Sequence, residues 1–334
     1  MSAGRVYITG AAGLIGKEAV RAFVRAGWTV SATDMISAPS GLQLERTTWG
    51  VQRVEDITAQ TLEGFDAVVH LAALTLSAEQ KSFGASADLP DARTMLGANV
   101  LGTEALFRAA AAASLPAVVY ASTAAVYGRP QFHTHLAGGT VERSGPFRPT
   151  SLYAHTKLMC EGLADFYAEH SESRFIGIRP TFSYGLGRLS GISGMFAAWI
   201  VQAIRGEAAV LGFPFGQDGQ LQLIYAKDMA QTFVDAAVAG RAGRGTGDTR
   251  SAVYNSPTRQ CLSMKEIASI VRDCTGNNQV RIAEGPFTPQ LQMPTMSTVD
   301  AFEILSCEQR YPLAQAVADM ARDLEAAAGS ARNG

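Results

Sequence analysis

The amino-acid sequence predicts an α/β protein in which a doubly wound parallel sheet is followed by a smaller C-terminal α/β lobe. Short, fully apolar runs alternate with helical segments through the first half of the chain, which is typical of parallel strands covered on both faces. A glycine-rich turn joins the first apolar run to the first helical segment. After Pro180 the alternation gives way to a stretch rich in glycine and serine, which marks the start of the second lobe.

These patterns assign the elements in chain order. Strands are expected at 5–10, 28–34, 51–56, 65–74, 115–123, 174–180 and 252–255, with short strands around a turn in 211–225. Helices are expected at 17–27, 98–114, 151–170, 195–206, 226–240 and 263–273. Loops are expected at 181–194, over a cleft, and at 241–250, and the tail from 325 is expected to fray. The predicted domains are 1–180 with 224–257 returning to it, and a substrate-binding lobe of 181–223 and 258–334.

The composition argues against several classes of protein. Of 334 residues, 47% are hydrophobic and 17% charged, which is typical of a folded globular chain. A formal net charge of −2 argues against nucleic acid or an anionic membrane surface as the main partner. No apolar run approaches the ~20 residues of a membrane span. The four cysteines contain no CxxC pair, so we expect a reduced, cytoplasmic protein without a zinc site. The chain enters a strand almost at once, with only Arg5 as a nearby positive charge, so no signal peptide is expected.

The glycine-rich turn predicts a dinucleotide site. Gly10, Gly13 and Gly16 stand between an apolar strand and a helix, where they allow a tight turn and a close approach of backbone to a pyrophosphate. Asp34 ends the second strand, about 20 residues further on, where a carboxylate accepts hydrogen bonds from the adenosine ribose. A 2′-phosphate would be repelled there, and Arg46 lies well past the strand end. The sequence therefore predicts a Rossmann-type domain that binds NAD rather than NADP.

A tyrosine and a lysine on the predicted helix 151–170 suggest acid–base chemistry. Tyr153 and Lys157 are spaced i, i+4, so their side chains share one face. A phenol with its ordinary pKa near ~10 is a poor base at neutral pH. An ammonium one turn away favours the phenolate and lowers that pKa. The same spacing also occurs in ordinary surface pairs, so the pair gains meaning only from its context.

Together these motifs resemble the extended short-chain dehydrogenase/reductase family, which includes nucleotide-sugar epimerases and dehydratases. The resemblance covers nearly the whole chain and rests on TGAAGLIG (9–16), Asp34, Asp56, HLAA (70–73), Asn99, STAAVYG (122–128), YAHTK (153–157) and IRPTFSYGLG (178–187). It implies that the cofactor is bound by Gly10, Gly13, Leu14, Ile15, Gly16, Asp34, Asp56, Ile57, Leu71, Ala72, Ala73, Asn99, Tyr153, Lys157 and Pro180. Asp56 and Ile57 are then expected at the adenine. Pro180 is expected beside the nicotinamide.

The resemblance also selects the third catalytic residue. The family places its catalytic Ser or Thr four residues before the tyrosine of the VYG-like element, and counting back from Tyr127 gives Thr123. Thr123, Tyr153 and Lys157 are therefore the expected catalytic residues. The neighbouring Ser122 either contacts substrate or makes a local backbone hydrogen bond. The other expected substrate contacts are Thr181, Ser183 and Arg188.

Departures from the family pattern narrow the expected chemistry. Dehydratases of the family carry Thr-Asp-Glu at this strand end, whereas Ala124 and Ala125 follow Thr123 here, so dehydration is disfavoured. Ser183 stands at the position of an asparagine, and Leu221 at that of an arginine, which help UDP-sugar epimerases to hold the nucleotide. The sequence therefore favours an NAD-dependent dehydrogenase acting on a small sugar, sugar acid or polyol. An NAD-retaining nucleotide-sugar epimerase and a non-enzymatic NAD-binding regulator stay open as alternatives.

The partners follow from the same reasoning. An anionic group on the substrate could be met by an arginine, the candidates being Arg143, Arg148, Arg179, Arg188 and Arg259, of which Arg188 is the best placed. No metal is expected, because His133 and His135 form an H-x-H pair without a third ligand. The family commonly dimerises through the two helices expected at 98–114 and 151–170, so a homodimer is expected.

Overall fold

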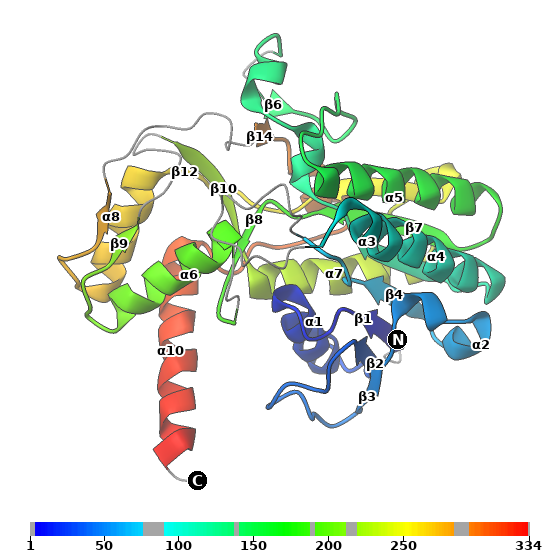
Figure 1. Cartoon of the computed structure of the whole chain (residues 1–334), viewed down its shortest axis with the longest axis horizontal. Coiled ribbons are helices and arrows are strands. Elements are labelled where there is room, and N and C mark those ends of the chain that lie inside the picture. The colour runs from blue at the N-terminus through cyan, green and yellow to red at the C-terminus, as the bar shows by residue number, and fades with distance from the viewer. Residues whose placement is uncertain are drawn as a thin grey trace.

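The centre of the molecule is a seven-stranded sheet in which every pairing is parallel (Figure 1). The computed structural model describes residues 4–75, 90–136, 140–187, 191–211, 219–283 and 294–332. The strands run in the order β11-β7-β5-β4-β1-β2-β3. Their bounds are β1 Arg5–Thr9, β2 Thr29–Asp34, β3 Thr47–Val51, β4 Ala67–His70, β5 Ala117–Ala121, β7 Arg174–Arg179 and β11 Ser251–Asn255. The predicted fold class is confirmed.

This strand order sets the position of the site. From β1 the chain first adds β2 and β3 on one side, then continues with β4 on the other. Such a reversal opens a crevice at the carboxyl ends of the strands on either side of it. The ends of β1 and β4 therefore flank the place where a ligand binds in folds of this kind.

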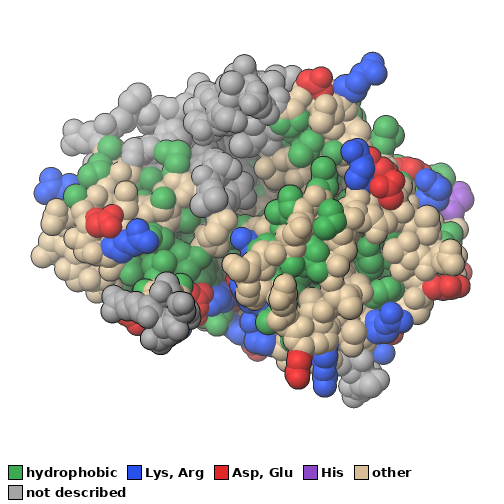
Figure 2. Space-filling model, turned by 60° about the horizontal axis from the view of Figure 1, so that its bottom comes forward, with side chains coloured by type: hydrophobic (Ala, Val, Ile, Leu, Met, Phe, Trp, Pro, Cys, Tyr) green, Lys and Arg blue, Asp and Glu red, His purple; other side chains and the backbone are tan. Residues whose placement is uncertain are grey.

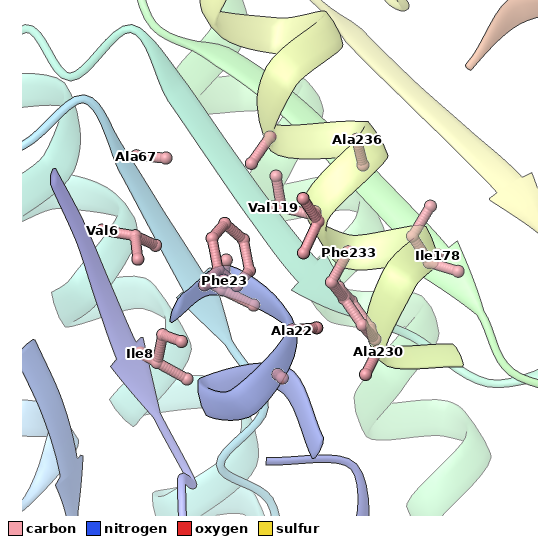
Figure 3. Close-up of a cluster of buried hydrophobic side chains, with 14 of the residues drawn as sticks. Val6, Ile8, Ala22, Phe23, Ala67, Val119, Ile178, Ala230, Phe233 and Ala236 are labelled. Atoms are coloured by element: carbon pink, nitrogen blue, oxygen red, sulfur yellow. The ribbon is translucent and has the colours of Figure 1, made fainter. Parts of the chain in front are cut away.

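Helices cover both faces of the sheet because its strands are apolar on both sides. One face is covered by α1 Leu14–Arg25 and α7 Ala226–Arg241, which contact each other. Phe23 of α1 and Phe233 of α7 lie against this face (Figure 3). The other face is covered by α2 Ala59–Leu62, α4 Gly102–Ala112 and α5 Leu152–Glu169, whose core includes Phe107 and Phe175. The short α3 Ala92–Leu96 and the π-helical η3 Gly97–Leu101 lead into α4.

The second lobe has a hydrophobic core of its own beside the carboxyl edge of the sheet (Figure 1). Its three-stranded sheet consists of β8 Phe182–Tyr184, β10 Gln220–Tyr225 and β12 Cys261–Ser263. Three helices pack there, namely α6 Gly191–Ile204, α8 Met264–Thr275 and α10 Leu313–Arg332. Two short pairs, β9 Val210–Leu211 with β13 Arg281–Ile282 and β6 Thr140–Val141 with β14 Thr295–Met296, join distant loops. The helix α9 Val299–Ile304 contacts β11.

Several boundaries differ from the sequence prediction. The strand expected at 51–56 lies earlier, at β3, and 54–56 form a 3-10 turn. The loop expected at 181–194 contains β8 and the start of α6, and the tail expected to fray from 325 continues α10 to Arg332. The loop 241–250 is not wholly exposed, because Gly245 and Thr246 are buried. The capping box of Ser263 and Glu266 is present at the start of α8.

The surface is mixed in charge. Acidic and basic side chains are interspersed over the face shown in Figure 2. No helix within the described ranges is long and apolar enough to cross a membrane.

Candidate active site

The turn after β1 is so tight that glycine is required at two of its positions. Gly10 has a φ of 67°, and a Cβ there would lie 2.4 Å from the backbone nitrogen of Ala72. A Cβ on Gly16 would lie 2.1 Å from the carbonyl oxygen of Gly10. Any larger residue would force the backbone apart, so the two glycines bring the start of α1 close to the ends of β1 and β4.

The first turn of α1 fits the pyrophosphate of NAD. Its N-cap, Gly13, has no side-chain cap, and no acidic residue lies in the first turn. The helix N-terminus therefore presents backbone N–H groups and a positive dipole end without a competing carboxylate. The first-turn residues Leu14 and Ile15 lie at this end, where the resemblance places cofactor contacts.

Asp34 lies beside the same turn. Its Oδ2 accepts a hydrogen bond from Ala12 N at 2.9 Å, and its Oδ1 accepts one from Met35 N at 2.7 Å. An ionised carboxylate has about four acceptor positions, so two stay available for ribose hydroxyls. The glycine turn, the uncapped helix start and Asp34 together form a donor and acceptor set suited to an NAD molecule.

The expected adenine contacts divide into one exposed residue and one core residue. Asp56 is exposed, as a residue that meets an adenine edge would be. Ile57 is only 3% exposed, and its side chain packs in the core beneath α4. The contact of Asp56 and Ile57 with the adenine stays a prediction, and the burial of the Ile57 side chain means that its backbone would have to make it. Leu71, Ala72 and Ala73 follow the end of β4, and Leu71 packs partly against the core.

Asn99 connects three segments of the site. Its side chain accepts a hydrogen bond from Leu74 N at 2.8 Å and donates to Leu74 O at 2.9 Å and to Thr156 Oγ1 at 3.1 Å. It lies in the π-helical turn η3, and its carbonyl oxygen accepts from Thr103 Oγ1 and Cys160 Sγ. Such turns are frequent at functional sites. Asn99 thus ties the segment after β4 to the helix that carries Tyr153.

Helix α5 carries Tyr153 and Lys157, and Lys157 reaches the end of β5. Ser151 caps the helix by accepting from Ala154 N, which fixes its start just before Tyr153. Lys157 is 2% exposed, and its Nζ donates to Ala121 O, the last carbonyl of β5, at 2.8 Å. Burial lowers the pKa of Lys157, while the nearby charges of Cys160 and Glu161 oppose that change. Tyr153 itself is half-buried.

Thr123 is oriented by the backbone that follows it. It caps a 3-10 turn, and its Oγ1 accepts from Ala125 N at 3.2 Å. The hydroxyl oxygen is used as an acceptor there, so its hydrogen can be donated to a substrate oxygen. Ala124 N donates to Pro180 O at 3.0 Å, which brings Pro180 next to this turn.

Ser122 has a different environment from that expected of a substrate contact. It is 1% exposed, and its Oγ donates to Glu161 Oε1 at 2.5 Å. The hydroxyl is committed to a buried carboxylate rather than to a substrate or to local backbone. Both interpretations of Ser122 drawn from the sequence are therefore corrected.

The candidate arginines are also largely engaged elsewhere. Arg179 is 2% exposed and forms a bidentate ion pair with Glu161, so it is not an anion site. Arg143 pairs with Asp300, and Arg259 lies over the ring of Phe302 at 4.2 Å. Arg148 is exposed. Arg188 lies outside the described residues.

The remaining expected substrate contacts lie on β8 and just before it. Thr181 forms two hydrogen bonds with Ser256. Its backbone N donates to Ser256 Oγ at 3.0 Å, and Ser256 Oγ donates to Thr181 Oγ1 at 3.2 Å. Ser183 is 9% exposed, and its Oγ is buried without a hydrogen-bond partner among the described residues.

His133 is buried with its Nε2 bonded to Tyr127 O. In the part of the chain that the structure describes, no cluster of His, Cys, Asp or Glu could hold a metal.

Three residues that sequence reasoning did not assign to the site emerge here. Glu161, Tyr127 and Asn255 form a buried network with Ser122 and Arg179. Glu161 lies four residues after Lys157 on the same helix, a spacing that the sequence displays. An acid one turn beyond the lysine was the available signal.

The chain is similar to known proteins along most of its length. The model of the NAD dependent epimerase/dehydratase family matches residues 6–250. UDP-glucose 4-epimerase 4 of Oryza sativa subsp. japonica is 27% identical over 85% of this chain and 80% of its own. A dTDP-glucose 4,6-dehydratase of Streptomyces niveus is 29% identical over 54% of each chain. MoeE5, solved with UDP-glucuronic acid and NAD, superposes with a TM-score of 0.76 at 24% identity, over 97% of this chain and 100% of that one.

The chain belongs to the NAD dependent epimerase/dehydratase family. The resemblance to extended short-chain dehydrogenases/reductases drawn from its motifs is thereby confirmed, and NAD is the cofactor. The structural likeness, at 24% identity, establishes the shared fold.

Proposed function

We propose that the chain is an NAD-dependent 4-epimerase of a sugar nucleotide, which oxidises a secondary hydroxyl and then reduces the resulting ketone from the other face. The observation that carries the proposal is the hydrogen bond from Lys157 Nζ to Ala121 O. It holds the ammonium of Lys157, which follows Tyr153 by one helical turn, at the carbonyl oxygen of Ala121, two positions before Thr123. This contact supports placing the acid–base pair and the hydroxyl that orients the substrate at the end of β5.

In this arrangement each side chain has a separate role. Thr123 donates its hydroxyl hydrogen to the sugar oxygen and so orients it. Tyr153, as phenolate, takes the proton from that oxygen during oxidation and returns it during reduction. Lys157 stabilises the phenolate by its charge, and two of its three hydrogens are available after Ala121 O is satisfied. NAD supplies the acceptor and donor of the hydride.

The turn that follows Thr123 carries no side chain suited to elimination. Ala124 is 1% exposed, and it and Ala125 follow Thr123 directly. Neither side chain can protonate a departing hydroxyl, so the chemistry proposed here ends with hydride transfer. Epimerisation is favoured over net oxidation because the relative matched over 85% of this chain is named a UDP-glucose 4-epimerase.

A second candidate is a dehydrogenase that releases NADH after oxidising a small sugar, sugar acid or polyol. The position of Leu221 favours it: this side chain is 3% exposed and packs in the core of the second lobe, opposite Leu262. A buried leucine gives no cationic contact to a diphosphate. A regulator without catalysis is disfavoured, because a protein that only binds NAD has no use for Thr123, Tyr153 and Lys157 together.

The fate of NADH distinguishes these functions. Purified protein is assayed with UDP-glucose, UDP-galactose, UDP-glucuronic acid and UDP-N-acetylglucosamine for epimer formation by chromatography. In parallel, free aldoses, uronic acids and aldonic acids with NAD are assayed for absorbance of NADH. The 4-epimerase predicts epimers without net NADH. Stoichiometric NADH with a free sugar or acid would instead establish the dehydrogenase.

Tyr153→Phe tests the mechanism common to both. Loss of the general base is expected to lower kcat by about 10²–10⁴-fold with NAD content unchanged. His155→Phe, on an exposed position of the same helix, is the matched control and should retain activity. A Tyr153→Phe variant that keeps most of its kcat would refute the mechanism.

A further inference from the structure

We infer that Glu161 is a positioning residue that fixes helix α5 against the ends of β5 and β7, so that Tyr153 and Lys157 face Thr123. The inference rests on the proposed function, since it concerns how that site is held together. The carboxylate of Glu161 is buried against Ser122 and Arg179. Its effect passes through Ser122 and Arg179, the two residues that precede Thr123 and Pro180.

Both oxygens of the Glu161 carboxylate accept hydrogen bonds from these two partners. Its Oε1 accepts from Ser122 Oγ at 2.5 Å and from Arg179 Nε at 2.8 Å, and its Oε2 accepts from Arg179 Nη2 at 2.6 Å. The exposed fractions of the residues Glu161, Ser122 and Arg179 are 5%, 1% and 2%. Charged bonds of this kind are strong and directional. They fix the distance between α5 and both strand ends.

Arg179 carries the connection across the sheet end. Its Nη1 donates to Tyr127 OH and to Arg143 O, both at 2.6 Å. Its guanidinium lies over the rings of Tyr127 and Phe147, at 5.1 and 4.6 Å from their centroids. Tyr127 OH in turn donates to Asn255 Oδ1 at 2.7 Å, at the end of β11. The network therefore reaches the carboxyl ends of three neighbouring strands.

The attachment points fall next to the proposed catalytic groups. Lys157 and Glu161, one turn apart on α5, bind the consecutive residues Ala121 and Ser122. On the strand side, Ser122 N donates to Ile178 O at 2.7 Å and Ala124 N to Pro180 O at 3.0 Å. Thr123 is thus held on both sides by β7, while α5 is fastened to the residue immediately before it.

The choice of a buried ion pair supports a positioning role. Replacing such a pair by packed apolar residues is often neutral for stability or favourable, because both charges lose their hydration on burial. A pair that is not needed for stability can still fix register, which apolar contacts do less well. This pair lies next to Ala121, Thr123 and Pro180, so the register that it fixes is that of α5 against the ends of β5 and β7.

Two variants test this inference without depending on the substrate. Ser122→Ala removes one hydrogen bond to Glu161 and leaves the ion pair, and Glu161→Leu with Arg179→Met replaces the pair by apolar side chains. The net charge of the site is the same in both as in the parent. The probe is the absorbance of the Tyr153 phenolate during a pH titration, isolated by subtracting the Tyr153→Phe spectrum. In Ser122→Ala, which removes no charge, a shift therefore reports a changed distance between Lys157 and Tyr153.

We expect both variants to keep Tm and bound NAD, and to titrate Tyr153 about one pH unit higher than the parent. With the substrate found in the screen above, kcat should fall about tenfold while KM stays unchanged. Ser173→Ala, a buried serine whose Oγ donates to Ala110 O far from the site, is the control and should change neither.

A parent-like titration and kcat in folded Ser122→Ala would overturn the inference, and this variant decides the matter even if the double variant fails to fold. A parent-like double variant would overturn it equally. Both results leave the proposed function standing. The proposed function is tested separately: it would be refuted if Tyr153→Phe retained its activity.

Discussion

The buried histidine at the end of β4 predicts a specific loss of stability in mild acid. His70 is 1% exposed, with Nδ1 at 2.7 Å from Thr9 Oγ1 and Nε2 at 2.9 Å from Thr103 Oγ1. Thr103 spends its own hydrogen on Asn99 O, so it must accept from the ring, and Nε2 carries the proton. Thr9 then donates to Nδ1. A second ring proton would face Thr9 and lose that bond.

Burial, reinforced by the charge of Lys157, lowers the pKa of His70 from 6.5 to about 3. The folded state therefore resists a proton that the unfolded chain takes up below 6.5. The resulting stability is complete above pH 6.5 and is lost as the pH falls from 6.5 toward 3. At pH 5 the loss is about 1.5 units of 1.36 kcal/mol each, or about 2 kcal/mol.

Urea unfolding at pH 7.5 and pH 5.0 measures this loss, in the parent and in His70→Gln. Glutamine removes the titrating group and keeps one donor and one acceptor. Carboxylates that also titrate in this window contribute equally to both proteins and cancel in the comparison. The parent should lose about 2 kcal/mol more than the variant between the two pH values. Equal losses in the two proteins would show that His70 is not held neutral in the folded state.

Three further outcomes follow from the cofactor site and the surface. Gly13→Ala should weaken NAD binding, measured by calorimetry, with little change in Tm, because its Cβ would meet only Gly10 O at 3.2 Å. Gly16→Ala should instead lower stability by about 1–3 kcal/mol, because its Cβ would lie 2.1 Å from that oxygen; the reverse ranking of the two would refute the packing argument. Asp34→Ala should cost about 1.5–3 kcal/mol of NAD affinity and lessen the preference over NADP in the same titration, and unchanged selectivity would contradict its role. Phe166, 52% exposed on α5, should support the proposed homodimer, so Phe166→Glu should elute as a monomer in gel filtration; a parent that is already monomeric would disprove the dimer.

The dimer prediction illustrates what helical period can and cannot assign. Helical period predicts outer positions for Leu106, Leu158 and Leu163 as well as for Phe166, with some of them packing on the sheet instead. Leu106 is fully buried, and the other two pack against the core clusters. Helices covered by other elements on several sides carry apolar residues around much of their surface, so the sequence cannot tell a sheet-facing leucine from a partner-facing one.

The parts of the site that could be predicted are those whose chemistry is set by local spacing. The glycine turn and the pair of Tyr153 and Lys157 depend on residues a few positions apart on one turn or one helix. The central strands could also be predicted from local sequence, since a buried parallel strand is apolar throughout. The position of the edge strand β3 could not be predicted, because β3 pairs with only one neighbouring strand. All five residues of TTWGV are exposed or half-buried, so no apolar run marks this strand.

The network around Glu161 could not be predicted because its members converge only in three dimensions. Arg179 and Ser122 lie on β7 and β5, which are neighbours in the sheet although 57 positions separate the two residues, and Tyr127 meets Asn255 across a separation of 128. An arginine near the carboxyl end of a strand in this fold is a reasonable candidate for an anion. The structure shows that the anion is a side chain of the protein itself.

The two adjacent hydroxyls of Ser122 and Thr123 show how a strand end separates structure from chemistry. Successive side chains of an extended backbone point to opposite sides, and Thr123 is extended, with φ −159° and ψ 144°. Ser122 therefore faces α5 and donates to Glu161, whereas Thr123 is turned the other way and caps the turn that leads to Tyr127. Because the position of Ser122 is set by the buried carboxylate, the direction of Thr123 is set as well. A serine that touches no substrate can in this way determine where the neighbouring hydroxyl points.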